Sequence, residues 1–138
     1  MGNKYINLLL KLAKKAYKRN EIPVSAIIVY NNKIIAKAYN KKNINKNALL
    51  HAEIICLQKA YKRLHRWNLS GCVMYVSLEP CDLCKLAIEE SRISKVIYIL
   101  DKGKCNNKYK NTQYEHMFVI ESKTFGKLIG DFFLKLRK

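Results

Sequence analysis

The sequence is poor in acidic residues. It has 10 Asp and Glu against 27 Lys and Arg among 138 residues, which gives a formal net charge of +17. Such an excess favours a polyanionic partner, whose phosphates would make the affinity strongly dependent on salt. Lysine, asparagine and isoleucine are all abundant, as an A/T-rich genome would also produce. The charge therefore supports an RNA partner without establishing one.

Long hydrophobic runs, linkers and repeats are also missing. The apolar residues 8–10 are few and are followed at once by Lys11, whereas a membrane span needs about 20 apolar residues. The same stretch lacks the features of a secretory signal. We therefore expect no membrane partner and a cytoplasmic protein, with an organellar matrix left open. Without linkers or repeats, residues 1–138 are expected to form a single domain.

Two short motifs combine residue types that bind zinc. They are His-Ala-Glu at residues 51–53 and Pro-Cys-Asp-Leu-Cys at residues 80–84. His51, Cys81 and Cys84 supply three zinc ligands, and a zinc ion with three protein ligands keeps a fourth position for water, whose pKa it lowers. We therefore predict one Zn²⁺ per subunit. The joint pattern H-x-E…P-C-x-x-C is the signature of zinc-dependent nucleobase deaminases.

The spacing within each motif suits a metal at the start of two helices. Cys81 and Cys84, three positions apart, share one face of a helix, and the positive end of the helix dipole favours their thiolates. His51 and Glu53 are two positions apart in a first helical turn, so their side chains diverge. One side chain can bind the metal while the other moves protons of the bound water, which makes Glu53 the predicted catalytic residue.

Two other interpretations of the cysteines stay open. A Cys-x-x-Cys pair also serves in redox proteins, although no thioredoxin-like pattern surrounds this one. A structural zinc site would need a fourth ligand, for which Cys56, Cys72 and Cys105 are the candidates; the first two lie in apolar runs and are expected to be buried. Five cysteines is an odd number, and we expect a reducing compartment rather than disulfides.

The hydrophobic pattern along the chain alternates between helical and strand periods. It predicts helices at residues 4–19, 51–64, 81–91 and 123–137, strands at 24–30, 33–39, 72–77, 95–100 and 118–120, and irregular segments at 40–50 and 101–114. A tight turn at Asn31 and Asn32 is expected to join the first two strands. This order favours an α/β fold with a mixed sheet and helices on both faces.

Further segments extend the pattern over nearly the whole chain. They are Glu-Ile-Pro-Val-Ser at 21–25, Ala-Tyr-Asn at 38–40, Ser-Arg-Ile at 91–93 and Asp-Phe-Phe at 131–133. With the two zinc motifs, they make the chain resemble the bacterial-type tRNA-specific adenosine deaminases of the cytidine deaminase superfamily. The resemblance implies a three-layer α/β/α sandwich with a mixed five-stranded sheet, a homodimer, and a tRNA anticodon stem-loop as partner.

The resemblance also implies an activity. The wobble adenosine of a tRNA anticodon would be converted to inosine by hydrolytic deamination, with Glu53 serving as base and then as acid. The residues that match substrate contacts of the family are Asn40, Ala52, Glu79, Phe132 and Phe133. Asn40 offers an amide to a purine edge but is also typical of a turn, and Glu79 is expected to orient its loop. The two phenylalanines are equally typical of a core, so at most one is expected to stack on a base.

The match has departures that bear on substrate choice. Residues 47–50 are Asn-Ala-Leu-Leu instead of a Pro-Thr-Ala-like run, and Ser25 replaces a glycine. Residues 101–115 are rich in lysine and lack the Gly-Ser-containing loop of the family. Two alternatives therefore stay open. One is a deaminase of a free base, nucleoside or nucleotide of the cytosine, guanine or deoxycytidylate type; the other is a non-catalytic RNA-binding partner subunit.

Overall fold

The computed structural model describes residues 2–102 and 111–137 and contains helices and strands in alternation. The helices are α1 (Gly2–Lys18), α2 (Ala52–Leu64), α3 (Asp82–Glu90) and α4 (Ser122–Leu136). The strands are β1 (Ser25–Tyr30), β2 (Lys33–Tyr39), β3 (Val73–Leu78), β4 (Lys95–Leu100) and β5 (Gln113–His116). Among these described helices, none is both long and apolar enough to cross a membrane.

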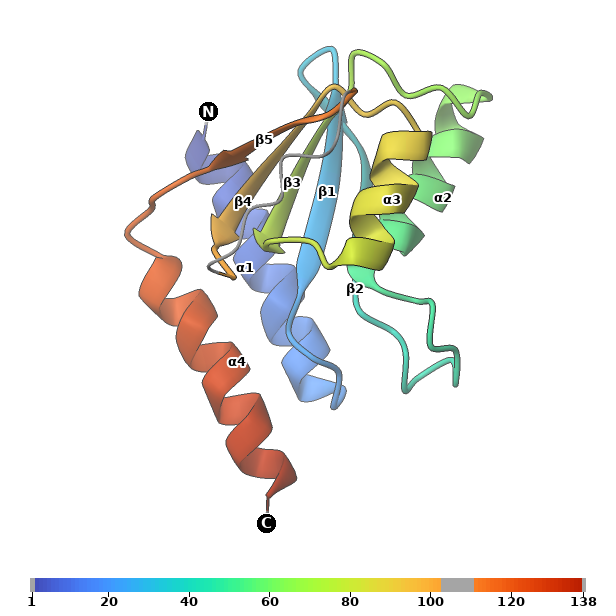
Figure 1. Cartoon of the computed structure of the whole chain (residues 1–138). Helices are drawn as coiled ribbons and strands as arrows, with labels where there is room; N and C mark the ends of the chain where they lie inside the picture. Colours follow the sequence, from blue (N-terminus) through green and yellow to red (C-terminus); the bar gives the residue numbers. More distant parts are fainter. Residues whose placement is uncertain (1, 103–110, 138) are drawn as a thin grey trace.

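The five strands form one mixed sheet in the order β2-β1-β3-β4-β5. β1 is antiparallel to both of its neighbours, whereas β3, β4 and β5 run parallel to one another. Helices α1 and α4 lie on one face of the sheet and α2 and α3 on the other, as Figure 1 shows. The predicted three-layer α/β/α sandwich with a mixed five-stranded sheet is therefore confirmed.

The β1–β2 hairpin determines where the chain enters the site. Asn31 and Asn32 have φ angles of 50° and 63°, and two positive φ values in a two-residue loop define a type I′ turn, which matches the twist of the strands. The register that begins at Tyr30 and Lys33 ends with Ser25 opposite Tyr39. Because β2 ends there, Asn40 directly follows the end of the sheet.

The core consists of two layers because side chains alternate across the strands. Ile28 packs into the layer beneath α2 and α3, and its neighbour Ile27 packs into the layer beneath α1 and α4. Cys56 and Cys72 are fully buried in the first layer, as expected from their apolar surroundings. Cys56 itself belongs to α2, and α2 and α3 both begin on this side of the sheet.

The last strand lies before the position that the sequence pattern predicts. The predicted strand 118–120 is wrong, because Phe118 and Ile120 are 86% and 95% exposed. The strand is β5, in which Tyr114 pairs with Val96 of β4. The predicted irregular segment 101–114 therefore ends too late, and its residues 103–110 lie outside the described residues.

Candidate metal and substrate site

The two predicted zinc motifs meet where α2 and α3 begin. His51 and Cys81 each occupy the N-cap position of their helix, with extended backbone angles of φ −69°, ψ 152° and φ −73°, ψ 173°. Neither side chain makes a capping hydrogen bond to its own helix. Both side chains are therefore available to face one another across the gap between the helices.

The three predicted ligand atoms have the separations that a zinc ion requires. His51 Nδ1 lies 3.7 Å from Cys81 Sγ and 3.5 Å from Cys84 Sγ, and all three atoms lie within 4.8 Å of one another. Tetrahedral zinc with bonds of about 2.0 Å to nitrogen and about 2.3 Å to sulfur separates those atoms by about 3.5 Å. The donor set and its spacing therefore fit zinc.

The cluster contains three ligands in the part of the chain that the structure describes. Cys56 and Cys72, two of the three candidates for a fourth ligand, are buried in the core and are not members of the cluster. Cys105, the third candidate, lies outside the described residues. Three protein ligands are typical of a catalytic zinc ion rather than a structural one.

The two thiols share a hydrogen bond that shifts their pKa values in opposite directions. The bond to Cys84 is the main cause that lowers the pKa of Cys81 to about 5, and His51 acts in the same direction. The pKa of Cys84 is raised by the same bond and by burial. Because the thiolate is the form that binds metal, Cys81 is the member of the pair whose environment favours the metal-binding form.

Glu53 places a buried carboxylate beside these ligands. The residue is 3% exposed, and its Oε1 has no hydrogen-bond partner within residues 2–102 and 111–137. Burial raises the pKa of Glu53 to about 7, with a smaller contribution from the charge of Cys81. A buried polar atom without a partner is uncommon and indicates that a ligand or water completes the site.

A small pocket of about 110 Å³ opens in front of the cluster. Asn40 is 5% exposed and accepts a hydrogen bond from the backbone N–H of Ala52 at 2.7 Å. Because this bond engages the carbonyl oxygen of the amide, the NH₂ group of Asn40 remains to donate into the pocket. The residues that line the pocket are Ile22, Val24, Asn40, His51, Glu53, Leu78, Glu79, Cys81 and Lys102.

The carboxylate of Glu21, which lies before β1, binds the loop between β2 and α2 by hydrogen bonds. Glu21 is 1% exposed and accepts hydrogen bonds from the backbone N–H groups of Asn43 and Ile44 at 3.1 Å and 2.6 Å. This contact stabilises the loop that connects Asn40 to His51. The sequence places Glu21 in a family-like segment, but its role in holding this loop could not be predicted from the sequence.

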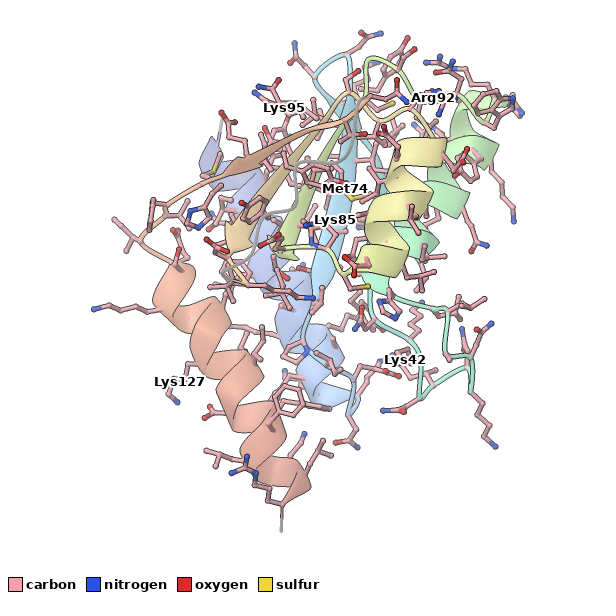
Figure 2. The ribbon with its side chains drawn as sticks, viewed as in Figure 1. Lys42, Met74, Lys85, Arg92, Lys95 and Lys127 are labelled. Atoms are coloured by element: carbon pink, nitrogen blue, oxygen red, sulfur yellow. The ribbon has the colours of Figure 1, made fainter. Side chains whose placement is uncertain are left out.

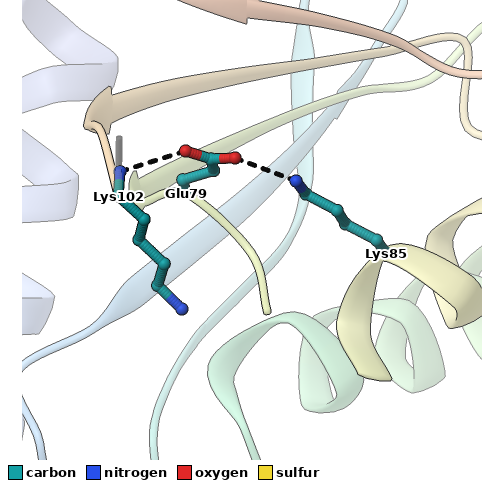
Figure 3. A network of polar contacts seen from close by, with 3 residues as sticks. All are labelled: Glu79, Lys85 and Lys102. Atoms are coloured by element: carbon teal, nitrogen blue, oxygen red, sulfur yellow. Dashed lines mark hydrogen bonds and ion pairs between the residues drawn. The ribbon is translucent and has the colours of Figure 1, made fainter. Parts of the chain in front are cut away.

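Glu79 joins three segments behind the pocket (Figure 3). One carboxylate oxygen accepts a 2.8 Å bond from Lys85 Nζ, and the other accepts a 3.0 Å bond from the backbone N–H of Lys102. Both Glu79 and Lys85 are buried, at 1% and 4% exposure. The pair therefore connects the loop before α3, the body of α3 and the chain that leaves β4.

We expect Lys85→Met to destabilise the protein by about 3–5 kcal/mol, because it leaves the Glu79 charge buried without its ion partner. Lys127→Met is the matched control. Lys127 also bonds a carboxylate, that of Asp131, but its side chain is 77% exposed, so a change within about 0.5 kcal/mol is expected. Figure 2 shows Lys85 pointing inward from α3 and Lys127 on the outside of α4. Equal urea midpoints for the two variants would contradict this role.

The two phenylalanines of α4 are placed apart from the pocket lining. Phe132 is 2% exposed and Phe133 is 45% exposed, with their ring centroids 5.5 Å apart. Neither ring is among the described residues that line the pocket. The structure thus brings together Asn40, Glu79 and the zinc motifs, with Ala52 as hydrogen-bond donor to Asn40, but it does not bring in α4.

Known proteins are similar to this chain over nearly its whole length. The MafB19-like deaminase family matches residues 2–137. The chain belongs to this deaminase family. A tRNA-specific adenosine deaminase of Bacillus subtilis is 35% identical over 145 aligned residues, which cover 97% of this chain and 89% of the relative. One of Aquifex aeolicus is 37% identical over 153 aligned residues, which cover 99% of the chain and 97% of the relative.

A solved structure extends the comparison of this deaminase to three dimensions. It comes from work on A-to-I editing by tRNA:A34 deaminases at the wobble position of transfer RNA. It matches with a TM-score of 0.77 and 26% identity, over 83% of this chain and 98% of the other. The resemblance to tRNA-specific adenosine deaminases that the motifs predict is therefore confirmed.

Proposed function

We propose that this deaminase hydrolyses the wobble adenosine of a tRNA anticodon to inosine with the help of a zinc ion. The observation that carries the proposal is the buried Glu53 carboxylate beside three ligand atoms spaced for zinc, at the wall of one small pocket. Relatives that cover nearly the whole chain and are named for this activity support the same assignment.

His51, Cys81 and Cys84 would hold the ion, which supplies Lewis acidity that lowers the pKa of water. Glu53 accepts a proton from the attacking water and delivers it to the ring nitrogen N1, where it stays; it then takes the proton of the new C6 hydroxyl group and delivers that one to the leaving amine. A C6–O bond forms and the C6–N bond to the exocyclic amine breaks, so adenosine and water give inosine and ammonia. Burial raises the pKa of Glu53, which favours a carboxyl group that can hold a proton between the two transfers.

The residues around Glu53 would hold the base. The Asn40 NH₂ group donates to an acceptor on the purine edge, and the Ala52 N–H holds Asn40 in that orientation. Glu79 acts on the substrate indirectly, because it accepts a hydrogen bond from the backbone N–H of Lys102 and so fixes that part of the pocket wall. Phe133, which lies apart from the pocket, is assigned to stacking on another nucleotide of the loop because its ring is the exposed one of the two.

We also propose a location and an oligomeric state. The reaction belongs where tRNA is present, in the cytoplasm or in an organellar matrix that holds its own tRNA. We assign a homodimer to the protein, and exposed Leu83 and Leu86 on α3, at 42% and 59%, offer an apolar surface for the second copy. Sedimentation of the purified protein tests this state: a mass of one chain contradicts it.

The activity is tested with an anticodon stem-loop that carries adenosine at the wobble position. We expect inosine at that position and none in the same stem-loop with the adenosine moved by one nucleotide, because the pocket takes one base presented by the loop. Parallel reactions with free cytidine, cytosine and guanine are expected to release no ammonia. A zinc-loaded protein that forms no inosine, or that deaminates a free base faster, would overturn the proposal.

A further inference from the structure

A basic cleft runs along the open edge of the sheet, outside the pocket described above. β2 is the edge strand of the sheet, with α1 and α2 on opposite faces (Figure 1). Residues of these three elements line the basic cleft. Two adjoining hollows of about 380 Å³ and 320 Å³ form it, and they share Lys37 and Lys59. Among the described residues, six cations and no acidic side chain line the basic cleft: Lys15, Arg19, Lys37, Lys41, Lys59 and Arg63.

The cations of the basic cleft come from separate elements and converge on one strand. Lys15 lies on α1 and Lys59 on α2. Lys59 Nζ donates a 2.7 Å hydrogen bond to the backbone carbonyl of Lys37 on β2, so this side chain lies across the strand edge. Burial and the neighbouring charges of Lys41 and Lys37 lower the pKa of Lys59, as expected where cations are crowded together.

The strand edge adds backbone donors to this charge. In an antiparallel ladder the N–H and the C=O of one residue point to the same side. Because the carbonyl of Lys37 meets Lys59 outside the sheet, the N–H of Lys37 also faces the basic cleft. Lysines on an edge strand commonly prevent a second strand from pairing, but that role does not account for Lys15 and Arg19, which come from α1 and the turn after it.

The basic cleft and the substrate pocket are lined by neighbouring residues of the chain where β2 ends. Tyr39 and Lys41 line the basic cleft, and Asn40 between them lines the substrate pocket. Because Lys41 directly follows Asn40, one end of the basic cleft lies next to the chain segment that lines the substrate pocket. Lys41 Nζ also lies 5.2 Å from the centre of the Tyr39 ring, which holds this cation at the boundary.

We propose that the basic cleft binds the phosphodiester backbone of the substrate RNA, outside the nucleotide that enters the pocket. This inference rests on the proposed function, since it takes RNA as the substrate. Cations that share the described lining with no acidic residue match the charge of phosphates, and the backbone N–H of Lys37 provides a further donor to their oxygens. The basic cleft reads no base, so it adds affinity to every tRNA and leaves selection of the adenosine to the pocket.

The test compares two triple variants that remove the same charge. The cleft variant is Lys15→Gln/Arg19→Gln/Lys37→Gln, and the control variant is Lys33→Gln/Lys62→Gln/Lys123→Gln. All six side chains are exposed, and the control lysines line neither hollow. Lys41 and Lys59 are left unchanged, because Lys59 bonds the β2 backbone and Lys41 lies next to Asn40.

The readout is the Kd for tRNA at several KCl concentrations, which does not depend on turnover. We expect the cleft variant to bind at least about 10-fold more weakly, with a slope of log Kd against log salt smaller by about 2, as loss of three phosphate contacts predicts. The control variant should change Kd by less than about 3-fold. The kcat of the cleft variant should equal that of wild type.

Three results would overturn the proposal. One is an equal loss for both triple variants, which would mean that only total charge matters. Another is an unchanged Kd and salt slope in the cleft variant. A third is an unchanged Kd for tRNA with lost binding to phosphatidylserine vesicles, which would assign the basic cleft to a membrane surface. Absence of inosine from wild type would contradict the proposed function alone, because Kd for tRNA is still measured.

Discussion

Glu53→Gln should keep its zinc and lose inosine formation by about 10³-fold in kcat, within the range that a general acid–base group supplies. Glutamine has nearly the same shape, so the helix and the three ligands beside it are preserved. It cannot take up a proton from water or deliver one to the purine. The measurement pairs single-turnover conversion of the stem-loop with the zinc content of the same sample.

Glu90→Gln is the matched control for that experiment. Glu90 also lies on one of the two helices that form the site, at the last residue of α3, but it is exposed. It should keep both zinc and activity at wild-type levels. If Glu53→Gln retained full activity with zinc bound, Glu53 could not be the proton carrier, and another group in the pocket would have to be sought.

The zinc motifs could be predicted because their geometry is local. The spacing of Cys81 and Cys84 and their position at a helix start follow from a few consecutive residues. His51 must also reach both sulfur atoms, and this depends on the fold. The α/β pattern made it predictable, because it places two helix N-termini at the same end of one sheet. For this reason the five-stranded sheet agrees with what the sequence predicts, and the three residues predicted as ligands lie together, while their binding of zinc stays a prediction.

Features that depend on pairing between distant segments were not predictable in the same way. β5 has the polar sequence Gln-Tyr-Glu-His and becomes a strand because it pairs in parallel with β4, so the more apolar residues 118–120 gave a false signal. Lys85 follows a cysteine on a short helix, where lysine is usually solvated. Its burial results from Glu79, which approaches from the end of β3. The basic cleft likewise combines residues of α1, β2 and α2, so no contiguous sequence motif predicts it.

Cys84→Ser should remove the metal and abolish inosine formation. Serine is a poor zinc ligand because its hydroxyl, unlike a thiol, stays protonated near neutral pH. Two protein ligands then remain, His51 and Cys81, and we expect the zinc content after dialysis to fall from about one ion per chain to below about 0.1. Zinc content and conversion of the wobble adenosine are measured on the same preparation.

Cys56→Ser provides a chemically identical control in the same helical layer. Cys56 is also fully buried, and its sulfur lies 3.6 Å from the carbonyl oxygen of Ala26, a bond that a serine hydroxyl can keep. Both variants bury a hydroxyl in place of a thiol, so a loss of stability alone would affect both. Zinc should be lost from Cys84→Ser and kept in Cys56→Ser. Retention of zinc by both variants would instead mean that Cys84 is no ligand, and the metal would then have to be held by a donor outside the His51, Cys81 and Cys84 cluster.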